Sequence, residues 1–236
     1  MTNAEKFLDI YNQLDKFLKN GNNQNHETFA SKIKSSKNSI IKSYRDKLID
    51  YGELRNAITH TPKLGGNYIA EPLGEVVNEF AMILQKLLNP QKVIPLFSFE
   101  VIGANENERL DKILNVMREK SFSQFPVFDE GGMVAELINT NTISRWLGKN
   151  INQNEIMVEN PIIKELIVDI EFKKNFKFIS RDCDIYTAYD LFIDQINIHK
   201  RNLDVLFITN SGSENEKLLG LITIEDIANK VKNVHS

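Results

Sequence analysis

Two groups of residues have types and spacings that could carry chemistry. The first consists of Arg55, Asn56 and His60, with His60 five positions after Arg55 and four after Asn56. Arginine is a permanently charged, forked donor for phosphate, and histidine moves protons near neutral pH. The second group is Thr223 and Asp226, which follow an apolar run and precede a helical pattern. A hydroxyl and a carboxylate at the N-terminus of a helix could bind phosphate or sugar hydroxyl groups.

Both groups also have purely structural interpretations. The spacing Thr-x-x-Asp is that of an ordinary helix-capping pair. Positions five apart lie about 140° apart around an ideal helix. Arg55 and His60 therefore share no face unless the helix frays near Thr59. A histidine near the C-terminus of a helix also complements the helix dipole. These alternatives stay open at the level of the sequence.

The composition indicates a folded protein with a sizeable core. The chain has 236 residues and a net charge of −3, and 42% of its residues are hydrophobic, which suits one large or two moderate domains. The single cysteine, Cys183, excludes an intramolecular disulfide and a cysteine-cluster zinc site. No metal site is expected, because the histidines lack metal-ligand spacing. Without an apolar run of about 20 residues or a signal peptide, we expect a cytoplasmic protein with no membrane partner.

The first 92 residues show only helical patterns. Apolar residues recur at spacings of three and four from Phe7 to Leu18 and from Phe29 to Ile58, with a break expected at 35–39. A last helix is predicted to begin near Glu71. Basic residues dominate the stretch 31–47, which suits contact with phosphate or a solvated helix face. The pattern predicts a small all-α bundle over residues 1–92.

The rest of the chain repeats another pattern. The segment 93–102 is predicted to be extended. The order strand-helix-strand-strand-helix then fits residues 93–150 and again residues 151–236, and an internal repeat is stronger evidence than any single element. The predicted fold class is therefore α+β, an all-α bundle followed by two tandem β-α-β-β-α repeats.

Three segments resemble the motifs of CBS domains. Residues 219–227 are similar to the closing strand-to-helix motif of that family, residues 178–188 to its opening strand and helix, and residues 125–132 to its central strand and hairpin. The resemblance covers about residues 95–232. It implies a pair of CBS domains with clefts between their sheets, which in many members bind AMP, ADP, ATP or S-adenosylmethionine. We therefore predict an adenosine-type regulatory ligand, with no cofactor required.

This resemblance implies a ligand site in the second repeat. Thr223 would meet a phosphate or ribose oxygen, and Asp226 would accept hydrogen bonds from both ribose hydroxyls. Adenine would stack among apolar strand residues such as Ile179 and Val205, and Ser180 completes the predicted set.

The first repeat departs from the family pattern. Asn139 stands in the place of the threonine and Thr142 in the place of the aspartate, so this cleft is expected to bind ribose more weakly. In the second repeat, Glu225 stands where many nucleotide-binding relatives carry a basic residue. Its charge disfavours a triphosphate and favours a less charged adenosine compound.

A second resemblance concerns the helical part. Residues 53–60 resemble the signature of HEPN domains, compact helical bundles that often dimerise and are in many cases metal-independent ribonucleases. This likeness covers about residues 1–90. It implies that Arg55, Asn56 and His60 are catalytic residues, completed across a dimer, and that RNA is a partner.

The favoured hypothesis is a regulatory sensor without enzymatic activity. Its CBS pair would bind an adenosine-type ligand and modulate a helical dimerisation or effector domain through a population shift. A homodimer is expected. The alternatives are a ligand-gated ribonuclease that uses Arg55 and His60, and a CBS pair without ligand that serves as a dimer scaffold.

Overall fold

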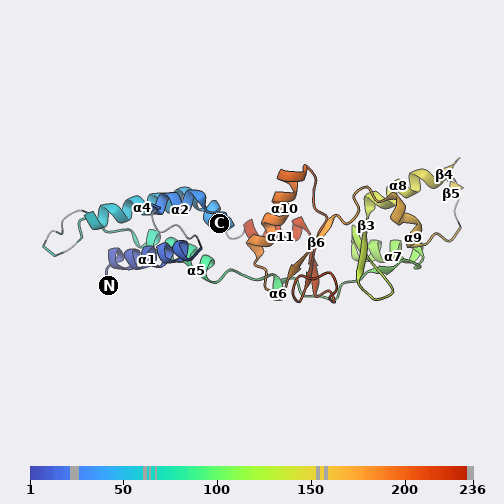
Figure 1. Ribbon diagram of the computed structural model, residues 1–236, viewed down its shortest axis with the longest axis horizontal. Coiled ribbons are helices and arrows are strands. Elements are labelled where there is room, and N and C mark those ends of the chain that lie inside the picture. The colour runs from blue at the N-terminus through green and yellow to red at the C-terminus, as the bar shows by residue number, and fades with distance from the viewer. Residues whose placement is uncertain are drawn as a thin grey trace. The chain divides into compact units, whose positions relative to one another are not determined.

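The computed structural model describes residues 1–21, 27–60, 63, 65–66, 68–152, 155–156 and 159–232. The chain divides into two compact units, residues 1–91 and 92–236, whose elements are labelled in Figure 1. Within the described residues, no helix is long and apolar enough to cross a membrane.

The first unit is built from helices where the apolar periodicity predicts them. Its described elements are α1 (Asn3–Gly21), α2 (Phe29–Ser35), α3 (Ser39–Ser43), α4 (Arg45–His60) and α5 (Gly74–Leu88). Phe7 from α1, Tyr51 from α4 and Phe80 from α5 meet in its core, with ring centroids 4.7 to 5.8 Å apart. Such aromatic contacts tie the three longest helices together.

Two helix boundaries in this unit depend on side-chain caps. The expected break near residues 35–39 is present, and the Asn38 Oδ1 there accepts hydrogen bonds from the amides of Ile40 and Ile41. The last helix begins at Gly74, later than the predicted start near Glu71. Glu71 instead caps α1, because its Oε1 accepts a hydrogen bond of 2.7 Å from the amide of Asn3.

The second unit contains the predicted β-α-β-β-α order twice. Its first half comprises β1 (Ala104–Asn105), α7 (Leu110–Lys120), β2 (Gln124–Phe128), β3 (Val134–Asn139) and α8 (Thr140–Asn150). Its second half comprises β6 (Phe176–Ser180), α10 (Ile185–His199), β7 (Val205–Thr209), β8 (Gly220–Ile222) and α11 (Ile224–Lys232). In each half the first strand is parallel to the second, and the second is antiparallel to the third.

Short elements precede and connect the two halves. The helical turn before the first half bonds to the second half, and the helical turn before the second half bonds to the first. Between the halves lie β4 (Ile151–Asn152), β5 (Glu155–Ile156), α9 (Ile163–Leu166) and the 3₁₀ turn η1 (Ile167–Asp169); α6 (Val93–Leu96) precedes the first half. The amide of Val93 in α6 donates to the Cys183 carbonyl of the second half, at 2.9 Å. The amide of Ile163 in α9 donates to the Glu108 carbonyl of the first half, also at 2.9 Å. Figure 1 accordingly shows α6 beside the half that holds β6 and α10.

The prediction that residues 93–102 are extended is wrong in part. Residues 93–96 form α6, and the first strand begins only at Ala104. Among the described residues, no strand pairs with the start of this segment in a ladder, and only an isolated bridge joins Lys92 to Asp184. The amides of the segment pair with the turn before α10, through Val93, and with the carbonyl of Leu219 beside β8, through Phe99 at 3.2 Å.

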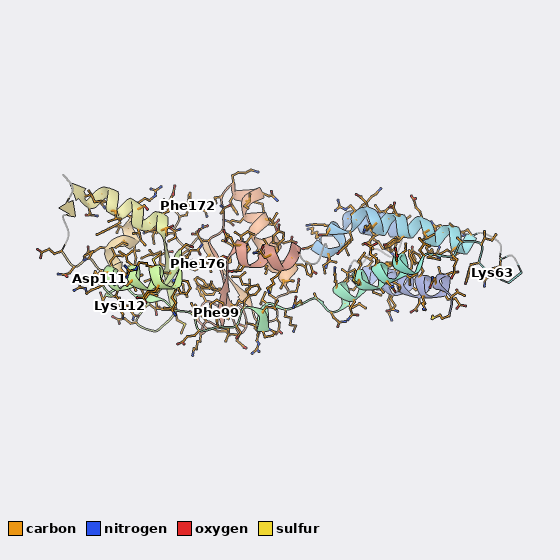
Figure 2. All side chains as sticks on the ribbon, turned by 180° about the vertical axis from the view of Figure 1, so that it is seen from behind. Lys63, Phe99, Asp111, Lys112, Phe172 and Phe176 are labelled. Carbon is orange, nitrogen blue, oxygen red and sulfur yellow. The ribbon has the colours of Figure 1, made fainter. Side chains whose placement is uncertain are left out.

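An apolar cluster lies between the two sheets of the second unit. Leu137 from β3 packs with Val205 and Phe207 from β7, and all three are less than 5% exposed. Phe176 and Phe178 of β6 surround them, with Phe176 labelled in Figure 2. Because both sheets bury one face in this cluster, their edges and the adjoining helix ends form the walls of two clefts.

Candidate ligand clefts

The larger cleft of the second unit has a volume of about 450 Å³ and contains the N-terminus of α11 in its wall. We call it the Thr223 cleft. Besides Thr223 and Asp226, its walls come from the linker 97–102, from the turn 121–123 before β2, and from strand residues that include Gln124, Val205 and Leu137. Pockets of about 300–1,000 Å³ are of the size that small-molecule ligands occupy.

Thr223 and Asp226 cap α11 and line the cleft at the same time. The amide of Thr223 donates to Asp226 Oδ2 at 3.0 Å, and the Thr223 hydroxyl donates to the same oxygen at 2.7 Å. The amide of Asp226 donates back to Thr223 Oγ1 at 3.4 Å. This reciprocal pattern is a capping box, so the structural interpretation of the pair is correct. It is compatible with ligand binding, because both side chains also border the cleft.

Exposed apolar side chains form much of the wall of the Thr223 cleft. Phe99, Ile102 and Phe122 are 49%, 42% and 39% exposed. Burial of large hydrophobic side chains lowers the free energy, so these exposed side chains form a surface that a ligand would favourably cover. Figure 2 labels Phe99 in the linker that follows α6. A flat apolar ligand would remove these side chains from water.

Gln124, at the start of β2, also lines this cleft. Its Oε1 is buried and has no hydrogen-bond partner among the described residues. A buried acceptor without a donor costs about 1–3 kcal/mol. Because this oxygen is itself shielded from solvent, it would meet a ligand only after a rotation of the side chain.

The structure brings together three of the five residues predicted for this site. Val205, Thr223 and Asp226 line the Thr223 cleft, whereas Ile179 and Ser180 are not among the described residues that border it. Ile179 is buried, and Ser180 holds the turn after β6, where its hydroxyl donates to the Asn210 carbonyl at 3.2 Å.

The sequence reasoning missed the contribution of the linker, which supplies Phe97, Phe99, Glu100 and Ile102 to the cleft. The available signal was Gly220. A Cβ at that position would lie 1.8 Å from the Phe97 carbonyl oxygen, so only glycine lets the linker cross β8 so closely.

A smaller cleft of about 280 Å³ lies at the N-terminus of α8, and we call it the Asn139 cleft. Asn139 Oδ1 accepts hydrogen bonds from the amide and the hydroxyl of Thr142, at 2.9 and 3.1 Å. Asn139 and Thr142 therefore occupy the same capping positions on α8 that Thr223 and Asp226 occupy on α11. Leu137 belongs to the walls of both clefts.

The Asn139 cleft is polar and contains Asp204 opposite the cap. Asn139 Nδ2 donates to Asp204 Oδ2 at 3.4 Å. Burial raises the pKa of the Asp204 carboxyl above its usual range, and hydrogen bonds from Asn175 and Asn139 and the charge of Arg201 oppose this shift. The guanidinium of Arg201 also lies 4.7 Å from the ring centroid of Phe172, which Figure 2 labels.

In the helical unit, the structure does not place Arg55 and His60 on one face. Helix α4 is continuous through His60, so positions five apart diverge as ideal geometry predicts. The Arg55 guanidinium lies 5.3 Å from the ring centroid of Tyr11, and its Nη1 donates to Asn56 Oδ1 at 3.2 Å. His60 is exposed at the helix end. A catalytic role for these residues, and RNA as a partner, stay predictions.

Comparison with protein families identifies part of the chain. Residues 155–233, which include α9 and the whole second half of the second unit, match the family model of the CBS domain. A CBS domain therefore lies at 155–233. No curated protein matches the chain.

Several solved structures with CBS domains show a distant likeness. The CBS domain pair of protein MJ0100, in complex with 5′-methylthioadenosine and S-adenosyl-L-methionine, is 16% identical, with a TM-score of 0.44 over 61% of this chain and 98% of that one. CBSX2 in complex with AMP is 13% identical, with a TM-score of 0.43 over 62% and 99%. A CBS domain-containing protein of unknown function from Bacillus anthracis str. Ames Ancestor is 17% identical, with a TM-score of 0.40 over 56% and 85%.

Proposed function

We propose that the second unit is a pair of CBS domains that binds an adenosine-containing small molecule in the Thr223 cleft and regulates the helical unit. One observation carries this proposal. Thr223 and Asp226, the residues that the CBS resemblance assigns to sugar or phosphate binding, border a cleft of about 450 Å³ with exposed aromatic walls.

Internal symmetry supports the inclusion of the first half in the pair. Only the second half lies within the family match, but both halves have the same element order and the same strand pairing. The helical turns α6 and α9 are exchanged between the halves through equivalent hydrogen bonds, from Val93 and Ile163. Both closing helices carry a cap at the same two positions.

In this proposal the cap residues keep their structural role while they bind ligand. Asp226 uses Oδ2 to hold Thr223, so its other carboxylate oxygen accepts a hydrogen bond from a ribose hydroxyl. The adenine ring covers the apolar wall formed by Phe99, Ile102 and Phe122.

The linker offers a route from ligand to effector. Residues 97–102 form one wall of the cleft and follow α6, which begins the second unit directly after the helical unit ends at Gln91. A ligand that favours one arrangement of this wall changes the populations of linker conformations. We propose that the helical unit responds by a change in dimerisation, which analytical ultracentrifugation with and without ligand would detect.

The test is isothermal titration of the full chain with AMP, ADP, ATP, 5′-methylthioadenosine and S-adenosylmethionine. We expect at least one to bind, and a ligand at about 100 times its Kd to stabilise the fold by about 2.7 kcal/mol. Asp226→Ala should abolish binding, because it removes the ribose acceptor.

A matched control separates binding from capping. Asp184 caps α10 by accepting hydrogen bonds from the amides of Tyr186 and Thr187, and it borders neither cleft. Asp184→Ala should therefore lower stability as Asp226→Ala does, but keep the ligand. If no compound binds, or if both variants affect binding equally, the proposed function is wrong.

A further inference from the structure

We propose that the Thr223 cleft binds a nucleoside without a phosphate group and prefers one that carries a positive charge. This inference rests on the proposed function and deepens it by assigning the charge of the ligand. It follows from three features of the cleft: the carboxylates at the helix N-terminus, the charge of the linker wall and the aromatic side chains.

The N-terminus of α11, where a helix would attract phosphate, already carries carboxylates of the chain itself. Such termini attract anions through their free amides and the helix dipole. At α11 the Thr223 amide and hydroxyl both donate to the carboxylate of Asp226. Glu225 adds a second carboxylate in the same first turn. A phosphate at this terminus would lie close to the carboxylates of Asp226 and Glu225, which like-charge repulsion opposes.

The linker wall of the cleft has the same sign of charge. Glu100, from the linker, borders the cleft together with Glu225 and Asp226. Among the described residues that line this cleft there is no lysine, arginine or histidine. Two separate segments thus contribute carboxylates to one cavity, and neither supplies a cation that could neutralise a phosphate.

The remaining walls suit a ligand that carries donors and a positive charge. Phe97, Phe99 and Phe122 offer aromatic rings, whose faces attract cations. Phosphate oxygens would be further acceptors in a cleft whose charged groups are all acceptors already. An amino group, sugar hydroxyls and a cationic centre complement it.

The test compares three compounds by titration of the full chain at neutral pH and low salt. S-adenosylmethionine has a sulfonium centre, S-adenosylhomocysteine is its uncharged thioether counterpart, and AMP carries a phosphate. We expect the sulfonium compound to bind about five-fold more tightly than the thioether, with AMP the weakest, because two or three carboxylates act through partly solvated space. The preference should decrease as salt is added.

Variants then test whether the cleft carboxylates cause the preference. Glu225→Lys, at an exposed position, should change the ratio of the affinities for S-adenosylmethionine and AMP about five-fold in favour of AMP. Glu100→Gln should change this ratio in the same direction by less. Glu165→Gln in α9 is the control, because Glu165 is exposed and borders neither cleft.

The outcomes separate this inference from the proposed function. If AMP binds as tightly as S-adenosylmethionine, or if Glu225→Lys leaves the ratio unchanged, the charge preference is refuted while adenosine binding stands. If neither these three compounds nor ADP, ATP and 5′-methylthioadenosine bind, the proposed function fails and this inference fails with it.

Discussion

Replacement of Gly220 by alanine should damage both the stability and the binding site of the second unit. A Cβ at Gly220 would lie 1.8 Å from the carbonyl oxygen of Phe97 and 3.0 Å from its carbonyl carbon. Neither side can move freely. Gly220 is paired with Ile208 in the sheet, and the linker is held to β8 by the hydrogen bond from Phe99 to Leu219.

The expected cost is about 2–4 kcal/mol in the free energy of unfolding. Overpacking against fixed atoms costs about 1–3 kcal/mol. Loss of the hydrogen bond from Phe99 to Leu219 adds about 0.5–1.5 kcal/mol. Because Phe97 and Phe99 line the Thr223 cleft, the displaced linker should also weaken ligand binding in the same variant.

Urea unfolding followed by tryptophan fluorescence measures this cost. Trp146 is the single tryptophan of the chain and is 3% exposed in the core of the second unit, so its emission reports on that unit. Gly148→Ala is the matched control, since a Cβ there meets no atom within 4 Å in helix α8. It should stabilise the unit by about 0.5–1 kcal/mol. A Gly220→Ala midpoint equal to that of the wild type would refute the close approach of the linker.

Three further predictions follow from individual contacts. Burial raises the pKa of Asp204, so its ionisation costs stability as the pH rises through that pKa, and Asp204→Asn should raise Tm near neutral pH. That gain should vanish in acid below the ordinary aspartate pKa of about 3.9, and a gain that persists there would contradict the assignment. Leu137→Ala should cost about 2–5 kcal/mol by Trp146 fluorescence, because it empties the space between Val205 and Phe207, whereas Leu137→Met should cost less than about 1.5 kcal/mol. Asn38→Ala removes the cap of α3 and should lower stability by about 1 kcal/mol, measured by circular dichroism during urea unfolding, and an unchanged midpoint would show that the cap is not formed.

The features that the sequence predicts well depend on local spacing. The capping positions of Thr223 and Asp226, and of Asn139 and Thr142, follow from the end of a strand and the start of a helix within a few residues. The repeated β-α-β-β-α order also follows from local periodicity, which each element carries by itself. These parts needed no knowledge of distant neighbours.

The features that the sequence did not predict depend on contacts between distant segments. The linker 97–102 has an apolar, β-rich composition, but its amides bond to Leu219 beside β8 and its side chains border the Thr223 cleft. No local pattern encodes that partner. Ser180 belongs to the predicted ligand-binding set, yet its hydroxyl bonds to the turn at Asn210.

The two clefts show how one backbone arrangement can serve different chemistry. Each is lined by a capped helix N-terminus and by Leu137. At α11 the amide of Thr223 donates to the carboxylate of Asp226, and the other charged side chains of the cleft are also negative. At α8 it is the uncharged amide of Asn139, and the cleft holds both Asp204 and Arg201. Under the proposed function, the backbone therefore determines where a ligand would lie, whereas a few side chains at each helix start and in the linker would determine its charge.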